Sequence, residues 1–386
     1  MKNRILVSTI SARLSEKEPL IQVIVGPRQV GKTTALKAAI GEKAIYESAD
    51  NPTPTQSSAI EEWWNRALES EAKILAIDEV QKISAWTEVL KKLWDKKPGA
   101  LKVIVTGSSA LLIEKGLRES LAGRFELIRA EHWNYQESKK VFDLSLSEFI
   151  EFGCYPGSLP ILRNDINRWG QYVMDSIIEP AIGRDLLQLY PVDQPALLRQ
   201  VFGAAISLPA QVVSLQKVQG QLHGKGTLPT IQHYLRLLSD AFLVSGVEKY
   251  SKSLLRMRKS SPKLIIHDNG LIRCFEKPIN KRISPEKLGH YFENCIGARF
   301  IEAGWSTYYW KDRDAEVDFI VIGPNNEKWA VEVKSSKVSE KELKSLFKFC
   351  ELHDDFEPVL VSLVGQRVDG IKSLAAEDVL SFSRKY

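Results

Sequence analysis

The sequence has little of what marks a secreted, disulfide-bonded or membrane-embedded chain. Its 386 residues include only four cysteines, far apart and without a C-x-x-C pair, which argues against a disulfide framework and a cysteine-based zinc site. No apolar run approaches the roughly 20 residues that a membrane-spanning helix needs, and residues 1–20 mix Lys, Arg and Glu with apolar residues, unlike a signal peptide. We therefore expect a cytoplasmic chain with no membrane partner.

A strong charge of either sign is also missing. The formal net charge of +5 is spread over the whole chain, so it permits an acidic partner such as nucleic acid but does not indicate one. The apolar content of 44% and the charged content of 26% are those of an ordinary globular protein. Because the length exceeds what one hydrophobic core normally supports, we expect two or three domains.

A phosphate-binding loop is the most specific feature of the first third. The stretch "IQVIVGPRQVGKTTALKAAI" at 21–40 indicates a short apolar strand, a loop between two glycines and an apolar-periodic helix. A G-x-x-x-x-G-K-T loop in that context turns backbone N–H groups toward a phosphate. Lys32 should reach the β- and γ-phosphates and Thr33 should ligate Mg²⁺, so ATP and Mg²⁺ are the expected cofactors. The expected phosphate-binding residues are Gly26, Pro27, Arg28, Gln29, Val30, Gly31, Lys32, Thr33 and Thr34.

Two acids follow a second apolar strand. In "KILAIDEVQKI" at 73–83, Asp78 and Glu79 stand where the strand ends, which is the edge at which open α/β sheets bind ligands. Asp78 should hold Mg²⁺ and Glu79 should polarise the attacking water. The alternative is a solvated acidic turn.

Hydroxyl residues follow a third strand. In "LKVIVTGSSA" at 101–110, Thr106 and Ser108 are placed to sense the γ-phosphate or to orient water. They are equally well placed to cap a following helix, which is what Ser and Thr usually do after a strand. The sequence leaves both roles open.

Together, "GPRQVGKTT", "ILAIDEVQK", "IVTGSSA" and "SLAGRFE" resemble the prokaryotic AAA-type ATPases that carry a C-terminal nuclease-like domain of unknown function. That resemblance implies that Arg124, in the last motif, is an arginine finger, a residue that stabilises charge on the transferring phosphoryl group. A finger acting in trans requires a homo-oligomer, which is the assembly we expect. The other interpretation is that Arg124 merely solvates the rim of a strand.

The middle of the chain changes character twice. Amphipathic stretches over 136–192 indicate a small helical lid, and three helices followed by a strand over 193–255 fit a winged helix-turn-helix. Its third helix would present Gln232, His233 and Arg236 to nucleic acid, most simply DNA. Alternatively, this module packs between the two enzyme-like domains and binds protein.

A hairpin carries the second set of candidate residues. In "AEVDFIVIGPNNEKWAVEVKS" at 315–335, Asp318 and Glu332 are each seven residues from Asn325, so a hairpin centred there sets them directly opposite, close enough to share a metal ion. Lys334 lies on the same face as Glu332. With Glu293 on a preceding helix, the order resembles PD-(D/E)XK nucleases, which implies Glu293, Asp318 and Glu332 as metal ligands and Lys334 as catalytic.

The hairpin also allows a purely structural interpretation, without a metal ion. The same register sets Glu316 opposite Lys334, and the two would then form a cross-strand ion pair on a partly exposed sheet. A D-x₁₃-E-x-K string is common enough that spacing alone does not decide between the two.

The predicted fold is α/β, with a P-loop AAA-type parallel sheet, a helical lid, a winged helix-turn-helix and a C-terminal α/β domain of the restriction-endonuclease type. The predicted limits of these domains are 1–135, 136–192, 193–255 and 256–386. The leading hypothesis is an ATP hydrolase coupled to Mg²⁺-dependent phosphodiester cleavage on DNA. The rival is a nucleotide-gated binding switch, for protein or DNA, whose nuclease-like domain is inactive.

Overall fold

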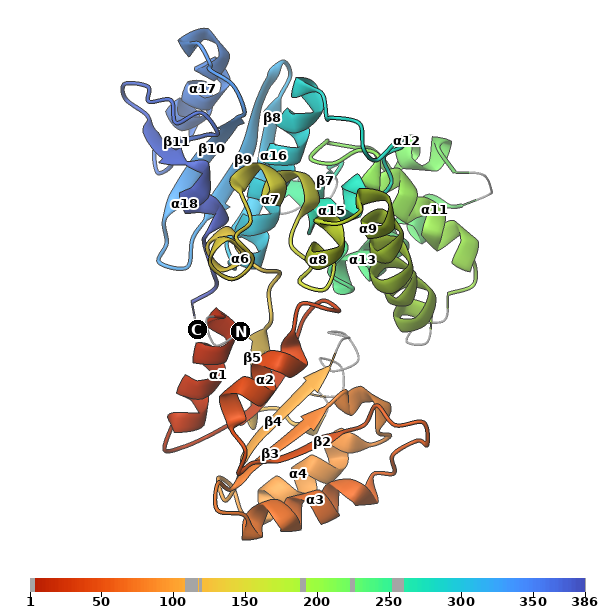
Figure 1. Cartoon of the computed structure of the whole chain (residues 1–386). Coiled ribbons are helices and arrows are strands. Elements are labelled where there is room, and N and C mark those ends of the chain that lie inside the picture. Colours follow the sequence, from red (N-terminus) through yellow and green to blue (C-terminus); the bar gives the residue numbers. More distant parts are fainter. Residues whose placement is uncertain are drawn as a thin grey trace. The chain divides into compact units, whose positions relative to one another are not determined.

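The computed structural model of the protein describes residues 4–107, 117, 120–187, 192–222, 226–251 and 260–385. The chain divides into two compact units, Met1–Glu131 and His132–Lys385, each built on its own sheet (Figure 1). This division lies four residues before the end predicted for the ATPase core. The finer divisions at 192 and 255 stay predictions.

Unit 1 is a five-stranded parallel sheet with strand order β2-β3-β4-β1-β5, flanked by helices (Figure 1). Its strands are β1 (Ile21–Val25), β2 (Ile45–Ser48), β3 (Ile74–Asp78), β4 (Lys102–Gly107) and β5 (Phe125–Arg129). Its described helices are α1 (Ile5–Ser15), α2 (Lys32–Ile40), α3 (Ser58–Glu69), the short 3₁₀ helix η1 (Val80–Lys82) and α4 (Trp86–Lys96).

The core of unit 1 follows from its apolar pattern. Every residue of β1 is buried because β1 lies between β4 and β5, as expected of a parallel strand covered on both faces. Along α4, Trp86, Leu90 and Leu93 are buried at helical spacing while the Lys residues between them face water. The predicted strand, loop and helix over 21–40 are confirmed.

Unit 2 is built on a seven-stranded mixed sheet with strand order β12-β11-β10-β9-β8-β6-β7. Its strands are β6 (Val244–Lys249), β7 (Lys263–Ile266), β8 (Ser306–Asp312), β9 (Ala315–Ile322), β10 (Lys328–Lys334), β11 (Glu357–Ser362) and β12 (Lys372–Ala375). The first group of helices is α6 (Tyr135–Phe142), α7 (Leu146–Phe152), α8 (Leu159–Leu162), α9 (Ile166–Val173), η2 (Met174–Ile178), η3 (Pro180–Leu186), α11 (Pro195–Ile206), α12 (Leu215–Gly220) and α13 (Leu228–Asp240). The second is α15 (Asn269–Arg273), α16 (Pro285–Glu302), η4 (Glu340–Leu343), α17 (Lys344–Leu352) and α18 (Ala376–Leu380).

The order of elements in 193–255 is the predicted one, three helices and then a strand. Strand β6 pairs antiparallel with β7 and also parallel with β8. The β6–β7 ladder is therefore the margin of the large sheet and not a free-standing wing. Whether this arrangement serves as a winged helix stays a prediction.

The β9–β10 hairpin has the predicted register. Lys328 pairs with Ile322, and the ladder continues to Val331 opposite Phe319. The next step along this register faces Glu332 with Asp318. Helix α16 packs against β7 to β10, and Gly297 permits the close approach, since a Cβ there would lie 2.6 Å from the Phe319 ring.

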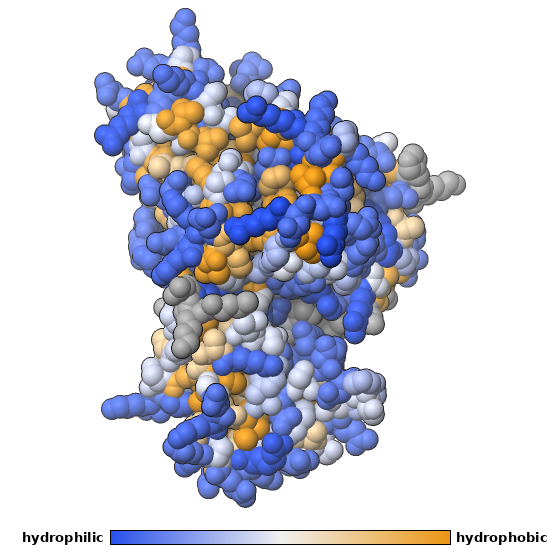
Figure 2. Space-filling view, in the orientation of Figure 1, coloured by the Kyte–Doolittle hydropathy of each residue, from blue (hydrophilic) through white to orange (hydrophobic). Residues whose placement is uncertain are grey.

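The surface is mixed but mainly polar. Figure 2 shows a face on which hydrophilic side chains predominate, with groups of apolar side chains between them. Exposed large hydrophobic side chains of the described residues, such as Leu20, Phe275 and Leu352, are scattered along the chain. In the part of the chain that the structure describes, no helix has the length and apolar character needed to cross a bilayer.

Candidate functional sites

The phosphate loop of unit 1 spans the six residues between β1 and α2. Gly26 has no space for a side chain, because a Cβ there would lie 2.2 Å from the carbonyl oxygen of Ala130. Gln29 and Gly31 have φ of 58° and 89°, in the left-handed region that an L-residue other than Gly adopts at a cost. Tight packing and these two left-handed residues together set the path of the loop.

Lys32 lies folded into the loop. It is 7% exposed, and its Nζ donates hydrogen bonds to the carbonyl oxygens of Gly26 at 2.9 Å and Pro27 at 2.7 Å. Burial lowers the pKa of Lys32 to about 8, although the charges of Glu79 and Asp78 act in the opposite direction. An ammonium in this environment favours an anionic partner.

Asp78 is a hydrogen-bond hub at the end of β3. Its Oδ2 accepts from Thr33 Oγ1 at 2.7 Å and from the Tyr46 hydroxyl at 2.9 Å, and its Oδ1 accepts from Thr106 Oγ1 and from the backbone N–H of Glu79. The structure therefore brings Thr33, Asp78 and Thr106 together. Thr106 belongs to β4, and its hydroxyl donates to the Asp78 carboxylate. Ser108 lies outside the described residues.

Tyr46 and Arg4 were not found by reasoning from sequence. Burial, and then the negative charge of Asp78, raise the pKa of Tyr46, so its hydroxyl stays a hydrogen-bond donor. Arg4 is 5% exposed, and its Nη1 would lie 3.6 Å from a Cβ placed on Gly31, which puts a guanidinium beside the phosphate loop. No local motif marks either residue, because each reaches the loop from a separate segment.

Glu79, directly after β3, has a left-handed backbone conformation. Its φ is 52°, and its carboxylate accepts a hydrogen bond from Gln81 Nε2 at 2.5 Å. Its charge acts on Lys32, so the two side chains share one electrostatic environment at the carboxyl edge of the sheet. Left-handed non-glycine residues are typical of sites where the surrounding structure over-determines the backbone.

Arg124 lies at the opposite edge of the same sheet. Its carbonyl oxygen accepts from Ile21 N–H at the start of β1, whereas the phosphate loop follows the end of β1. A five-residue strand separates the two by about 16 Å. The guanidinium forms a two-point pair with Asp95, at 2.6 and 3.1 Å. In this structure Arg124 therefore contacts Asp95 and lies away from the phosphate loop of its own chain.

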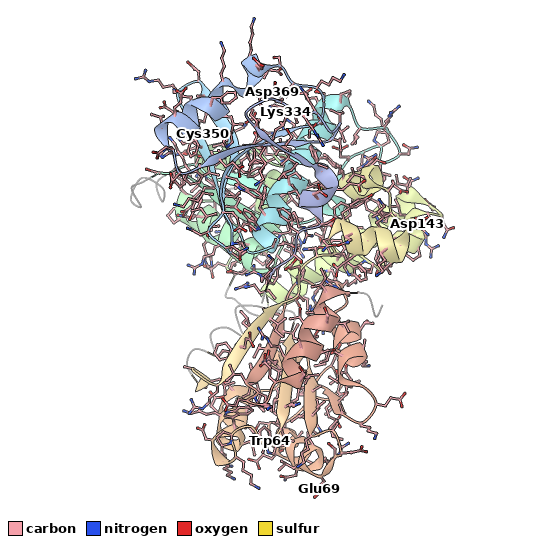
Figure 3. All side chains as sticks on the ribbon, turned by 90° about the vertical axis from the view of Figure 1, so that its left-hand side faces the viewer. Trp64, Glu69, Asp143, Lys334, Cys350 and Asp369 are labelled. Carbon is pink, nitrogen blue, oxygen red and sulfur yellow. The ribbon has the colours of Figure 1, made fainter. Side chains whose placement is uncertain are left out.

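Unit 2 gathers the second predicted set, which we call the acid cluster: Glu293 on α16, Asp318 on β9 and Glu332 on β10. The Val333 N–H donates to Asp318 Oδ2 at 2.8 Å, and Lys334 Nζ donates to Glu332 Oε1 at 2.7 Å. Lys334, labelled in Figure 3, ends β10 beside the cluster. The alternative Glu316–Lys334 pair is wrong, because Glu316 pairs with Lys311 at 2.6 Å.

A buried lysine next to the acid cluster, Lys263 at the start of β7, was not found by reasoning from sequence. It is 1% exposed, its Nζ forms an ion pair with Glu293, and it donates to the Asp318 carbonyl oxygen at 3.0 Å. Burial alone would lower the pKa of this ammonium, but the charges of Glu293 and Asp318 outweigh burial and raise it. The only available sequence signal was a lysine opening the otherwise apolar strand "KLII".

One buried carboxylate oxygen of the acid cluster has no hydrogen-bond donor among the described residues. Glu332 is 6% exposed, and its Oε2 has no hydrogen-bond partner. Burial, followed by the charge of Asp318, raises the pKa of both Glu293 and Glu332. A buried carboxylate oxygen without a donor is costly, and oxygen ligands from opposed carboxylates are what Mg²⁺ binds. These residues therefore fit a divalent cation at Asp318 and Glu332.

The outer residues predicted for α13 line a groove. Gln232, His233 and Arg236 face Glu248 of β6 and the segment 260–262 across it. Arg236 is the one fixed cation among the groove-lining residues that the structure describes, and Glu248 is the one acid among them. The groove thus offers hydrogen-bonding groups and little net positive charge.

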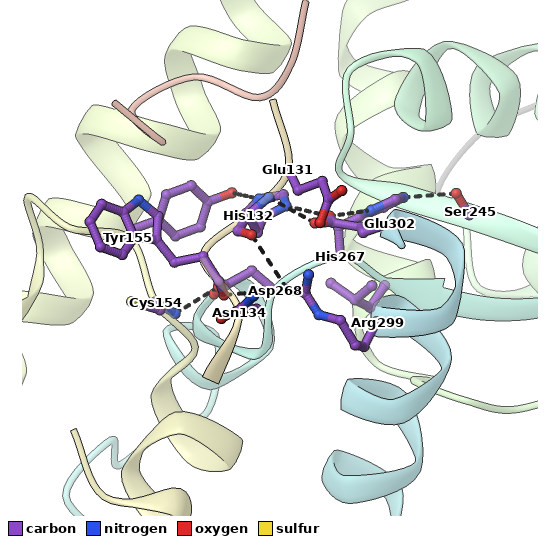
Figure 4. A network of polar contacts seen from close by, with 12 residues as sticks. Glu131, His132, Asn134, Cys154, Tyr155, Ser245, His267, Asp268, Arg299 and Glu302 are labelled. Atoms are coloured by element: carbon purple, nitrogen blue, oxygen red, sulfur yellow. Dashed lines mark hydrogen bonds and ion pairs between the residues drawn. The ribbon is translucent and has the colours of Figure 1, made fainter. Parts of the chain in front are cut away.

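A buried polar network surrounds Glu302 (Figure 4). The Nδ1 atoms of His132 and His267 both contact Glu302 Oε1, at 2.5 and 2.9 Å, while their Nε2 atoms contact the hydroxyls of Tyr155 and Ser245. The three side chains are close enough together to be compared with a metal site, but hydrogen bonds already occupy all four ring nitrogens. Hydrogen bonds of the network join His132, the first residue of unit 2, to Glu302, the last residue of α16.

Comparison with protein families finds three matches along the chain. Residues 18–149 match the model of a family described as an AAA domain. Residues 143–281 and 288–380 match two families, DUF8612 and DUF4143, described as domains of unknown function. These descriptions support an ATPase domain and identify neither a winged helix nor a nuclease.

Individual relatives are distant. An uncharacterized protein of Mycobacterium tuberculosis is 27% identical over 315 residues, which cover 80% of this chain and 69% of that protein. One of Methanocaldococcus jannaschii is 24% identical over 337 residues, with 80% and 73% covered. Solved structures include AMPPCP-bound DnaA from Aquifex aeolicus, 17% identical at a TM-score of 0.31, covering 62% of this chain and 88% of that one. The RuvB Holliday junction branch migration motor of Thermotoga maritima is 16% identical at a TM-score of 0.32, covering 63% and 88%.

Proposed function

Because residues 18–149 match an AAA domain, we propose that this protein binds ATP with Mg²⁺ and hydrolyses it at the loop between β1 and α2. The observation that carries this proposal is the 2.7 Å hydrogen bond from Thr33 Oγ1 to Asp78 Oδ2, beside the buried Lys32. A hydroxyl next to a carboxylate at the carboxyl edge of the sheet supplies the oxygen ligands that Mg²⁺ uses at triphosphates. When bound, the metal supplies charge neutralisation between the β- and γ-phosphates.

The residues of the site have separable roles. Lys32 binds the terminal phosphates, because its desolvated ammonium gains more from phosphate oxygens than from the two carbonyls it now contacts. Tyr46 and Thr106 donate to Asp78 and hold the carboxylate in position. Glu79 polarises the attacking water. Gln81 orients the Glu79 carboxylate by donating a hydrogen bond to it.

Arg124 acts, in this proposal, on the nucleotide of a neighbouring subunit. The support for this role is its position at the amino edge of the sheet, away from its own phosphate loop. The role needs a homo-oligomer in which Arg124 exchanges Asp95 for a phosphate of the neighbour. An arginine finger supplied in trans raises hydrolysis by about 10³- to 10⁵-fold in related chemistry.

Steady-state ATP turnover with Mg²⁺ tests the ATPase proposal. We expect Lys32→Ala to abolish turnover and Asp78→Asn to lower it by at least 100-fold. Lys96→Ala is the matched control, since Lys96 is an exposed residue in the last turn of α4. Equal rates in wild type and Lys32→Ala contradict the proposal.

A second function, Mg²⁺-dependent phosphodiester cleavage, is favoured by the unpartnered oxygen of Glu332 in unit 2. We propose that Asp318 and Glu332 hold the metal and that Lys334 orients a water. When bound, the metal supplies Lewis-acid polarisation of a phosphoryl oxygen. The substrate class is nucleic acid, with DNA as the first candidate.

We propose that the groove along α13 contacts that nucleic acid. Gln232, His233 and Arg236 offer donors and acceptors there, but a single arginine predicts a shallow dependence of affinity on salt. Fluorescence anisotropy with labelled duplex DNA, in wild type and Arg236→Ala, measures this contribution. No difference between the two would remove α13 from the interface.

Incubation with plasmid and oligonucleotide substrates tests cleavage. We expect Mg²⁺- or Mn²⁺-dependent cutting that Asp318→Asn abolishes, while Asp312→Asn, an exposed residue of β8, retains it. Cutting that persists in Asp318→Asn refutes the site. If wild type does not cut and yet binds a partner only with ATP, the protein is instead a nucleotide-gated binding switch, for protein or DNA.

A further inference from the structure

We infer that Lys263 is the resident cation of the acid cluster: its ammonium takes the place of a second divalent ion between Glu293 and Asp318, and the cluster holds one divalent ion at Asp318 and Glu332. This inference deepens the proposed metal-dependent function of unit 2 and rests on it. Phosphodiester-cleaving sites with two metals place the ions about 3.5–4 Å apart, sharing carboxylates.

The position of Lys263 is fixed by its surroundings. It lies in the margin of the sheet, paired with Val247 on one side and bridged to Val212 on the other. Its Nζ lies 4.7 Å from the centre of the Phe319 ring and donates to the backbone of β9. A side chain with so many constraints does not swing aside to admit a second ion.

The Lys263 ammonium can be buried because carboxylates lie beside it. A fully desolvated ammonium is strongly destabilising unless it is paired and hydrogen-bonded. Lys263 is 1% exposed and has Glu293 as its ion-pair partner, with Asp318 Oδ1 at 3.8 Å. By contrast, the Lys334 side chain is 29% exposed and reaches Glu332 from the rim.

The carboxylate oxygens are unequally satisfied. Glu293 Oε1 faces Lys263, Asp318 Oδ2 accepts from Val333, and Glu332 Oε1 accepts from Lys334. Glu332 Oε2 has no partner, and Asp318 Oδ1 is beyond hydrogen-bond distance from Lys263. Asp318 Oδ1 and Glu332 Oε2 are therefore the oxygens left to bind a cation, and the two together bind one ion.

Mn²⁺ binding to the full chain, without nucleotide, tests the inference. The number of ions at the cluster is the number lost in Asp318→Asn, which separates it from any Mn²⁺ bound at the phosphate loop. We expect one ion with an isolated-Mn²⁺ electron paramagnetic resonance spectrum in wild type, and two ions with an exchange-coupled spectrum in Lys263→Met. Lys311→Met, which removes a lysine from neighbouring β8, should leave one.

The outcomes distinguish the role of Lys263 from the metal site at Asp318 and Glu332. One ion in both wild type and Lys263→Met, or a coupled pair in wild type, overturns the inference and leaves the metal site standing. An absence of any Mn²⁺ that Asp318→Asn removes refutes the proposed metal function of the cluster, and the inference with it. Neither result depends on measured cleavage.

Thermal unfolding covers the case in which Lys263→Met folds poorly. In EDTA this variant should melt below wild type, because Glu293 and Asp318 lose their cation. Adding Glu293→Gln should recover part of the lost melting temperature by removing one of the unpaired charges. No recovery in Lys263→Met/Glu293→Gln contradicts the role of Lys263 as the cation of these acids.

Discussion

At the scale of single residues, the phosphate loop depends most on Gly26. Its missing side chain lets the loop pass against the backbone of Ala130, where a Cβ would lie 2.2 Å from an oxygen. Backbone cannot move aside as a side-chain tip can, so the cost of a methyl group falls on the loop.

We predict that Gly26→Ala lowers affinity for a fluorescent ATP analogue by at least tenfold, because displacement of the loop misdirects its N–H groups. Gly203→Ala in α11 is the control, since a Cβ there meets nothing within 4 Å. Unchanged binding by Gly26→Ala would show that the loop tolerates the shift.

Glu302 is the residue on which a buried network depends. Burial would raise the pKa of its carboxyl, but the charges of His132 and His267 and the hydrogen bonds from both rings hold the pKa well below its usual value. A depressed pKa in the folded state means that the ionised carboxylate stabilises the fold above the unfolded pKa of about 4.3. That stabilisation is lost as the pH falls through the folded pKa.

We predict that Glu302→Gln lowers the free energy of unfolding of unit 2 by about 3 kcal/mol at neutral pH, as expected when a buried pair loses one charge. The difference from wild type should shrink as the pH falls below about 4.3. Urea unfolding at several pH values measures it. A difference that does not change with pH contradicts the ionised state of Glu302.

At the scale of elements, the β9–β10 hairpin determines the geometry of the acid cluster. Its register sets Asp318 and Glu332 on facing positions, and a shift of one residue would turn every side chain of one strand to the other face. The turn holds this register: Gly323 N–H donates to Glu327 O, and Asn326 has φ of 64°.

We predict that Asn326→Val destabilises unit 2 by about 1–2 kcal/mol, because a β-branched residue disfavours positive φ. Asn326→Gly should be neutral or stabilising at the same position. Urea midpoints at constant m-value report the two changes. Equal midpoints for the Val and Gly variants would mean that the turn does not hold the register.

At the scale of the whole molecule, the chain is two compact units with separate sheets and separate sets of acids. Unit 1 has its candidate phosphate site at one edge of its sheet and Arg124 at the other. Within one copy of the chain, Arg124 is therefore remote from the phosphate loop.

We predict that Lys32→Ala and Arg124→Ala are each inactive alone and that mixing them restores part of the ATP turnover. In mixed oligomers the Arg124→Ala subunit keeps an intact phosphate loop and receives Arg124 from its neighbour. Turnover against the mixing ratio measures this, with Lys32→Ala/Arg124→Ala as the non-complementing control. No recovery in oligomers shown to be mixed contradicts action in trans.

Much of the fold and of both candidate sites was predictable where residues act through local spacing. The phosphate loop, the acids after β3 and the hairpin register all follow from fixed distances along the chain. The sequence left the role of Thr106 open between sensing the γ-phosphate, orienting water and capping a helix, and its contact with Asp78 is seen only in the tertiary structure.

The sequence alone determined the phosphate loop, the acids after β3 and the β9–β10 hairpin, because strand period, turn length and glycine position are local constraints. Tertiary structure alone decided which charges meet. Lys263 reaches Glu293 and Asp318 from a distant strand, Tyr46 reaches Asp78 across the sheet, and Arg124 ends up far from its own phosphate loop. Such pairings depend on strand order and helix packing, which no motif in one segment encodes.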